Sequence, residues 1–244
     1  MAEVLVLCYH AVSESWDASE SVTPDLLEWQ LNHLRRRGWR AATFRDAVLD
    51  PPAARTMAIT FDDAFTSVKE LAFPIVSKLG LTATVFAPTA YVGSGERCAW
   101  AGLDGWTSTP HANELAPMGW EELGELADSS WEIGSHTCTH PYLTKLDDAD
   151  LARELEEPRA EAVKRLGRPF ETIAYPYGDV DERVADFTRR VGYKAGAALS
   201  SHLRDLGPYR WPRTGIYQLD AWWRFLLKTT PTVRRVRASR VWPG

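Results

Sequence analysis

Short apolar runs alternate with amphipathic stretches along almost the whole chain. The apolar runs have the length and composition of buried strands, and the stretches between them repeat apolar residues at helical spacing. Strands are predicted at residues 3–9, 57–61, 82–87, 131–134, 172–175, 194–199 and 213–217. About seven strands alternating with helices predict a parallel α/β architecture, in which functional side chains gather at the carboxyl ends of the strands.

The helices are predicted from their caps and apolar stripes. The first begins at Thr23 and Pro24, where Thr23 can cap the amino terminus and proline occupies the first turn. Pro74 is expected to kink one helix, and Pro158 to interrupt the helix of residues 147–166. In addition to the helix of residues 147–166, the expected helices are 24–37, which is the first, 43–49, 68–79, which contains Pro74, 121–127, 180–191 and, as the last one, 220–227.

One long stretch, residues 89–117, breaks the alternation. It is rich in Gly, Ala, Pro and Thr and contains Trp100 and Trp106. A loop of this length in a compact domain is usually functional or disordered. A lid or substrate wall that carries both tryptophans is the favoured interpretation, and the alternative is a surface excursion with both rings packed down. Without a repeat or linker, residues 1–244 are predicted to form a single domain.

Composition excludes several classes of protein. The 244 residues carry a net charge of -5, which argues against a general nucleic-acid binder. No apolar run is long enough to span a bilayer, and the first residues resemble a strand rather than a signal peptide. Cys8, Cys98 and Cys138 are an odd, widely spaced set, which favours reduced thiols and therefore a cytoplasmic location.

Two adjacent carboxylates, Asp62 and Asp63, follow the strand of residues 57–61. Neighbours on a strand point to opposite sides, so the two side chains are not expected to share one structural role. Carboxylates beside a core are costly unless a cation or hydrogen bonds offset their charge. A helix cap is the simpler alternative, because aspartate is a favoured cap residue.

A second polar cluster, Gly134 to His140, follows the strand of residues 131–134. His136 and His140 fall on one face if this segment makes a helical turn, close enough to bind one metal ion. Because both clusters follow strands, we expect them on the same rim of the sheet. One aspartate and two histidines form a ligand set that leaves metal positions free for water and substrate. Cys138 is not expected to face the histidines.

A third motif, Ala174-Tyr175-Pro176-Tyr177-Gly178, also follows a predicted strand. Its proline and glycine predict a tight turn that could aim a backbone N–H into the site. With Thr60-Phe61-Asp62-Asp63-Ala64 and His136-Thr137-Cys138-Thr139-His140, it resembles the motifs of the polysaccharide deacetylase family, the NodB-homology domain. The motifs occur in the family's order, and Cys8-Tyr9-His10-Ala11-Val12 resembles the start of one branch. The resemblance covers nearly the whole chain.

The resemblance implies a distorted (β/α) barrel with about seven parallel strands, and hydrolysis of the N-acetyl group of an amino sugar. It also implies a divalent metal, usually zinc, with cobalt, nickel and manganese left open. Carried over residue by residue, Asp63, His136 and His140 would hold the metal. Asp62 would be the general base, and the N–H of Tyr177 would stabilise the oxyanion.

The chain departs from the family's pattern at two places. Many members begin the third motif with an arginine that orients the base, but here that position is Ala174. We expect Arg213 to supply this cation from the last strand; the alternative is a surface ion pair. The late Leu-x-His motif that usually provides the general acid is not evident. His10 is assigned this role because it follows a predicted strand on the expected rim.

The tail, residues 228–244, has no acidic residue and five basic ones: Lys228, Arg234, Arg235, Arg237 and Arg240. Peripheral contact with anionic lipid or with a phosphorylated, lipid-linked sugar is one interpretation, and a solvated, partly disordered end is the other. The expected partner is an N-acetylated sugar, with lipid- or nucleotide-linked forms left open. The rival functions are hydrolysis of another amide, such as a formamide or a non-sugar ring, and carbohydrate binding without catalysis. The sequence does not predict the oligomeric state.

Overall fold

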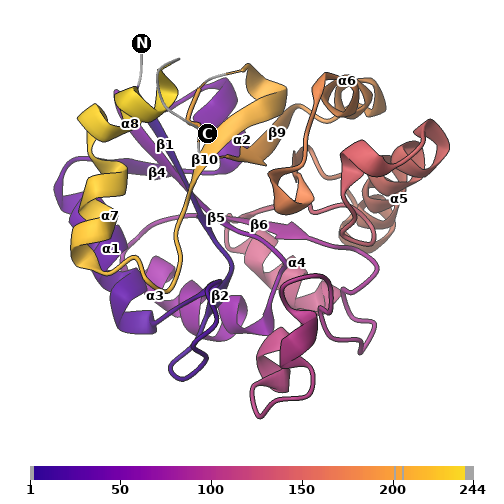
Figure 1. Cartoon of the computed structure of the whole chain (residues 1–244), viewed down its shortest axis with the longest axis horizontal. Helices are drawn as coiled ribbons and strands as arrows, with labels where there is room; N and C mark the ends of the chain where they lie inside the picture. Colours follow the sequence, from indigo (N-terminus) through magenta and orange to yellow (C-terminus); the bar gives the residue numbers. More distant parts are fainter. Residues whose placement is uncertain (1–2, 201, 205, 240–244) are drawn as a thin grey trace.

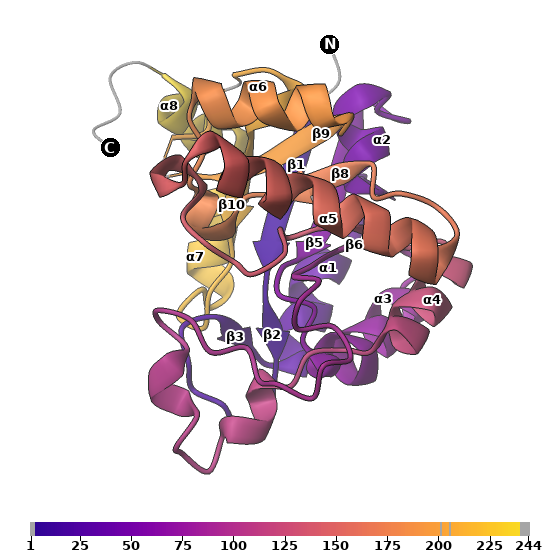
Figure 2. The ribbon, with the colours of Figure 1, turned by 90° about the vertical axis from the view of Figure 1, so that its right-hand side faces the viewer.

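Seven parallel strands close into a barrel in the computed structural model, which describes residues 3–200, 202–204 and 206–239 (Figures 1 and 2). In order around the barrel they are β1 (Glu3–Tyr9), β5 (Arg55–Phe61), β6 (Thr84–Ala87), β7 (Glu132–Ser135), β8 (Thr172–Ala174), β9 (Ala195–Leu199) and β10 (Trp211–Gly215). Strand β1 pairs with both β5 and β10 and so closes the ring. The predicted parallel barrel is confirmed.

The distortion of the barrel lies at β5. One edge of this strand pairs with β1, while the other is shared between β4 (Arg40–Ala42), at residues 56–58, and β6, at residues 60–61. Sequence analysis missed β4, and also the small parallel pair β2 (Ala11–Val12) and β3 (Ser21–Val22). Elements of two or three residues are too short to show a periodic pattern.

The helices surround the barrel, except that α2 lies at the end of the barrel where the strands begin. Their bounds are α1 (Pro24–Arg36), α2 (Phe44–Leu49), α3 (Phe73–Lys78), α4 (Trp120–Asp128), α5 (Asp148–Leu166), α6 (Glu182–Val191), α7 (Trp222–Thr229) and α8 (Pro231–Ala238). Thr23 caps α1 as predicted, and a π-helical turn (Val68–Ala72) precedes α3 where Pro74 was expected to kink the chain.

Two predictions about helices are wrong. Helix α5 runs unbroken through Pro158, which is buried, because the loss of one N–H is tolerated where tertiary packing supports the helix. The helix of residues 220–227 is not the last, since α8 follows it in the basic tail. Helix α8 has only Val233 and Val236 as apolar residues within its length, too few for a recognisable stripe.

The described part of the tail is helical and is held to the barrel by ion pairs, so a disordered end is wrong for residues 228–239, although no residue of α8 (Pro231–Ala238) is buried. Lys228 forms an ion pair with the buried carboxylate of Asp220, and Arg234 forms one with Glu3 at 3.1 Å. Arg240 lies outside the described residues. Among the described helices, none is both long enough and apolar enough to cross a bilayer.

Small side chains fill the barrel interior around one aromatic ring, that of Phe86. Strand alternation turns Val6, Ala58 and Ala174 towards it. A Cβ atom at Gly134 would lie 2.6 Å from the Phe86 ring, so only glycine leaves room for that ring. Phe44 of α2 packs edge-on against Phe86 from below, with ring centroids 5.6 Å apart. The interior is therefore a packed core and not a channel.

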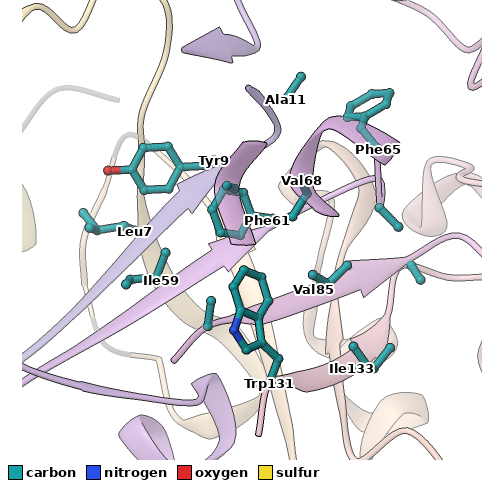
Figure 3. Packing of buried hydrophobic residues seen from close by; sticks show 14 of the residues in the cluster. Leu7, Tyr9, Ala11, Ile59, Phe61, Phe65, Val68, Val85, Trp131 and Ile133 are labelled. Carbon is teal, nitrogen blue, oxygen red and sulfur yellow. The ribbon is translucent and has the colours of Figure 1, made fainter. Parts of the chain in front are cut away.

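The opposite faces of the same strands carry larger side chains, which form the main core under the helices. Leu7, Ile59 and Phe61 are among them, and Figure 3 shows them clustered with Val85 and Trp131. The Phe61 ring stacks on Trp131, with centroids 5.8 Å apart. This two-sided burial explains why the strands were recognisable as continuous apolar runs.

A polar cluster occupies the end of the interior where the strands begin. Glu132 accepts hydrogen bonds from the hydroxyls of Thr84 (2.9 Å) and Thr172 (2.5 Å) and from the backbone N–H of Arg45 (3.0 Å). Burial raises the pKa of Glu132 above its ordinary value, and the three hydrogen bonds only partly oppose this effect.

This raised pKa predicts a pH-dependent contribution to stability. In the folded protein Glu132 keeps its proton to a higher pH than in the unfolded chain. Its contribution is therefore complete below the ordinary glutamate pKa and is lost as the pH rises through the folded-state pKa. In urea unfolding across this weakly acidic range, the variant Glu132→Gln should become progressively more stable relative to the natural protein as the pH rises. A stability difference that does not change with pH would contradict this assignment.

Candidate metal and catalytic site

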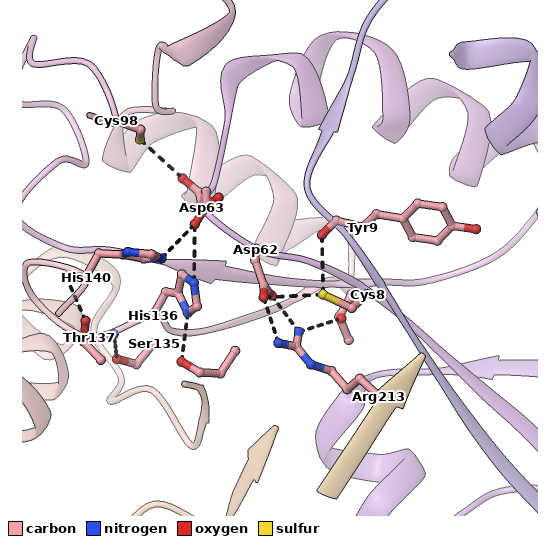
Figure 4. Close-up of polar contacts among 12 residues, drawn as sticks. Cys8, Tyr9, Asp62, Asp63, Cys98, Ser135, His136, Thr137, His140 and Arg213 are labelled. Atoms are coloured by element: carbon pink, nitrogen blue, oxygen red, sulfur yellow. Dashed lines mark hydrogen bonds and ion pairs between the residues drawn. The ribbon is translucent and has the colours of Figure 1, made fainter. Parts of the chain in front are cut away.

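A buried ion pair lies at the end of the barrel interior where the strands finish. Asp62 follows β5, and Arg213 reaches it from β10 with two parallel hydrogen bonds of 2.7 Å, Nη1 to Oδ1 and Nη2 to Oδ2 (Figure 4). Arg213 also donates to the hydroxyl of Thr60 and the carbonyl of Ala198. Only 1% of Arg213 is exposed, so the alternative of a surface ion pair is wrong.

The ion pair keeps Asp62 ionised. Burial alone would raise its pKa, but the adjacent Arg213 guanidinium outweighs burial and holds the pKa well below its ordinary value. The Cys8 thiol contacts Oδ2 of Asp62 at 3.5 Å. Burial raises the pKa of Cys8 well above its ordinary value, so the thiol keeps its proton and can donate to the carboxylate.

The second aspartate faces the two histidines. Oδ1 of Asp63 lies 3.3 Å from Nε2 of His136 and 3.5 Å from Nε2 of His140, and all three side chains are buried. Nδ1 of His136 lies 2.8 Å from the carbonyl oxygen of Ala174 and donates to it, which leaves Nε2 as the nitrogen that faces Asp63. The fold thus brings together two clusters more than seventy residues apart in the sequence.

This cluster fits a divalent cation. The three ligand atoms lie within 4.8 Å of one another, and Oδ1 of Asp63 is buried without a hydrogen-bond partner among the described residues. Burial lowers the pKa of His140 to about 3, whereas the carboxylates of Asp62 and Asp63 outweigh burial and raise the pKa of His136. A cation would compete with the proton for Nε2 of His136, because a metal ligand must be neutral. Two imidazole nitrogens and one carboxylate oxygen suit zinc and several other first-row metals.

The loop that carries the histidines is held by a buried glutamate from α5. Glu154 accepts hydrogen bonds from the backbone N–H groups of Cys138 and Thr139, both at 2.9 Å, and from the Thr139 hydroxyl at 2.6 Å. The hydroxyl oxygen of Thr137 accepts a further hydrogen bond from the backbone N–H of His140. Sequence analysis missed Glu154, because nothing distinguishes it from the exposed Glu156 and Glu157 on the same helix.

Unusual backbone conformations concentrate at the site. Of the six non-glycine residues with positive φ among those described, five lie in the loops that follow β5, β7 and β8: Asp63, Ala64, Thr137, His140 and Tyr177. Each such residue costs roughly 1–2 kcal/mol relative to an ordinary conformation. Surrounding hydrogen bonds and packing must offset this cost, and strain of this kind is typical of functional sites.

A pocket of about 250 Å³ opens above these residues. His10 lines it as predicted, and its Nδ1 has no hydrogen-bond partner among the described residues. Trp100 lines the pocket too and stacks on His140 with ring centroids 3.8 Å apart. Trp106 instead packs edge-on against Trp16, at 5.7 Å. Trp106 therefore follows the packed-ring alternative, whereas Trp100 lies at the pocket and its role as a substrate wall stays a prediction.

Tyr177 is also placed beside the metal cluster. It sits at φ 60° in a 3₁₀ turn (Pro176–Gly178), and its ring centroid lies 4.7 Å from that of His140. The next residue must be glycine, because a Cβ atom at Gly178 would lie 2.1 Å from the carbonyl oxygen of Leu199. This close packing against β9 fixes the turn. The role of the Tyr177 N–H remains a prediction.

The sequence matches known proteins over most of its length. Residues 50–196 match the family described as polysaccharide deacetylase. Over 215 residues the chain is 25% identical to the Bacillus subtilis (strain 168) protein YxkH, which covers 85% of this chain and 69% of that protein. Over 154 residues it is 26% identical to the poly-β-1,6-N-acetyl-D-glucosamine N-deacetylase of Staphylococcus aureus (strain MSSA476). That match covers 59% of this chain and 48% of the relative, so the chain spans about half of the relative's length.

Solved structures share the fold. The Streptococcus pyogenes deacetylase PplD, determined in complex with acetate, superposes with a TM-score of 0.76 at 20% identity, over 94% of this chain and 99% of that one. IcaB from Ammonifex degensii superposes with a TM-score of 0.69 at 21% identity, over 98% of both chains. At these identities the likeness establishes the barrel fold and leaves the activity to be argued from the site.

The contacts of Glu154 predict a loss of metal affinity when it is removed. Glu154→Ala leaves the N–H groups of Cys138 and Thr139 without their acceptor and loosens the loop that carries the histidines. We expect Zn²⁺ or Co²⁺ affinity, measured by calorimetric titration, to fall about 10- to 100-fold. Glu156→Ala, which removes an exposed carboxylate from the same helix, is the matched control, and thermal unfolding verifies that both variants fold. Equal affinities in the two variants would show that Glu154 does not position the ligands.

Proposed function

Because the chain belongs to the polysaccharide deacetylase family, we propose that it is a metal-dependent hydrolase that removes the N-acetyl group from an amino sugar of a glycan. One observation carries the proposal. A three-residue cluster that fits a divalent cation and a buried, ionised carboxylate on the adjacent residue line the same pocket. The name of the Staphylococcus aureus relative makes oligomers of N-acetylglucosamine the first substrates to test.

Asp63, His136 and His140 would hold the cation, with zinc as the first candidate. When bound, the cation would supply positive charge that polarises the amide carbonyl and makes water in the site more acidic. Asp62 would accept the proton from the attacking water. The two hydrogen bonds from Arg213 hold the carboxylate in one orientation and keep it ionised, so that it is ready to accept that proton.

Two further groups complete the proposed mechanism. The N–H of Tyr177 would donate to the carbonyl oxygen as negative charge develops on it. His10 would donate a proton to the departing amine, since its Nδ1 has no other partner among the described residues and its ring lines the pocket. None of the other histidines outside the metal cluster, His33, His111 and His202, lines this pocket.

The hydrolysis itself is tested by acetate release. Metal-loaded protein should release acetate from N-acetylglucosamine oligomers, lose this activity on chelation and regain it with Zn²⁺ or Co²⁺. Asp62→Asn should lower the turnover number by roughly 10²- to 10⁴-fold while retaining metal, whereas Asp63→Asn should lose metal affinity. Folding of both variants is checked by thermal unfolding, because Asp62→Asn leaves Arg213 without its counter-charge.

Different failures would support different rival functions. Formate release from a formylated amino sugar, without acetate release, would favour another amide as the substrate. Binding of acetylated sugars by metal-loaded protein that hydrolyses none of them would favour a carbohydrate-binding protein without catalysis.

The assignment of His10 has its own test. His10→Ala should lower the turnover number on the same oligomers by roughly 10²- to 10⁴-fold and leave the metal content intact, because the ring is proposed to act on the leaving group alone. His33→Ala, on α1 outside the pocket, is the control. Near-normal turnover in His10→Ala would remove this residue from the mechanism.

A further inference from the structure

A second groove borders the catalytic pocket. It has a volume of about 610 Å³ and is lined by α7, by the loop that precedes it and by residues that precede β3. Tyr217 lines both cavities. The loop before β3 also joins them, since Asp17 lines the groove and Glu20 lines the catalytic pocket. Figures 1 and 2 show the chain between β10 and α7 passing beside this loop, where the Gln218 N–H donates to the carbonyl of Ser19.

One wall of the groove is an exposed apolar stripe. Leu219, Trp223 and Leu227 recur at intervals of four residues and are 69%, 52% and 53% exposed. A surface helix normally buries such a stripe. Here α7 buries a different side chain, Phe225, which packs edge-on against Trp29 of α1 with centroids 6.1 Å apart. The attachment of α7 to the barrel therefore does not depend on the stripe.

Polar groups line the same groove as the indole of Trp223. Asp17 and Gln218 line the same cavity, and the Arg224 guanidinium lies 5.2 Å from the Trp223 ring centroid, where it restrains the ring. A pyranose ring combines an apolar C–H face with a rim of hydroxyls. An exposed aromatic ring next to carboxylate, amide and guanidinium groups matches both parts of that surface.

The same features argue against a lipid surface. Membrane-binding helices present an apolar face flanked by basic residues and free of acidic ones. This groove is concave, it contains Asp17, and its lysine, Lys228, is already paired with Asp220.

We propose that the groove is a subsite for a sugar residue next to the one whose acetyl group is removed. The inference rests on the proposed function and extends it, because it assigns the binding of the neighbouring sugar to Trp223 and the groove that this residue lines. The catalytic pocket, at about 250 Å³, is smaller than the groove beside it, at about 610 Å³. A groove of this size can hold a small ligand beside the reaction centre.

Two adjacent tryptophans of α7 provide the test. Trp223 lines the groove, whereas Trp222 is 60% exposed and does not line it. Each is changed to alanine in the full, metal-loaded chain that also carries Asp62→Asn, so that binding is measured without turnover. The probes are N-acetylglucosamine tetramers in β-1,4 and β-1,6 linkage, titrated by calorimetry. Trp223→Ala should raise Kd roughly tenfold, as expected for loss of a buried aromatic anchor, and Trp222→Ala should leave Kd unchanged. Equal values of Kd in the two variants would overturn the proposal.

The subsite and the hydrolysis can fail separately. A Trp223 effect on binding, in a protein whose parent releases no acetate, would keep the subsite and remove the hydrolase. Acetate release without a Trp223 effect would do the reverse. Vesicles of phosphatidylcholine and phosphatidylserine are the second probe. Sedimentation with them that is lost in both tryptophan variants, while tetramer affinity is unaffected, would assign the stripe to a membrane. If the protein forms a dimer that dissociates on dilution, and either variant abolishes this dimer, the stripe would be assigned to contact with a second copy of the chain.

Discussion

The site depends on a buried ion pair, which can form only when the barrel closes. Asp62 follows β5 and Arg213 lies on β10, two strands that are separated by β1, so the guanidinium reaches the carboxylate across the barrel interior. Removing two such groups from water costs several kcal/mol per ion, and a buried pair is tolerated only when geometry and additional hydrogen bonds offset that cost. Here the parallel pair of hydrogen bonds and the contact with Thr60 do so. Asp63, the next residue, is thereby aimed away from the interior and towards the histidines.

A second constraint acts on the loops. Positive φ at Asp63, His140 and Tyr177 directs neighbouring backbone groups into orientations that ordinary loops do not adopt. Glu154 supports the loop that carries the histidines from outside the pocket, and the close packing of Gly178 on Leu199 fixes the turn that carries Tyr177. Rigid elements therefore hold the strained segments, an arrangement that keeps ligand geometry fixed before a ligand arrives.

The sequence revealed the parts of this structure that depend on local pattern. The barrel strands were visible because burial on both faces makes them continuously apolar, and the site clusters because their polar residues follow such strands. Arg213 could be located because the third motif has Ala174 where an arginine was expected, which left a buried carboxylate in need of a cation. Glu154 could not be found in this way, because its role depends on hydrogen bonds that it accepts from two backbone N–H groups of a distant loop. Helix α8 and the fit of Gly134 against Phe86 likewise depend on tertiary contacts that no local pattern records.

The Phe86 ring, seated on Phe44, has one further consequence. The two rings close the barrel interior at the end where the strands begin, so the barrel is open at one end only. Phe86 and Phe44 therefore leave no route to the site through the barrel interior. A polymeric ligand would therefore have to lie across the open end of the barrel, because it cannot thread through the interior.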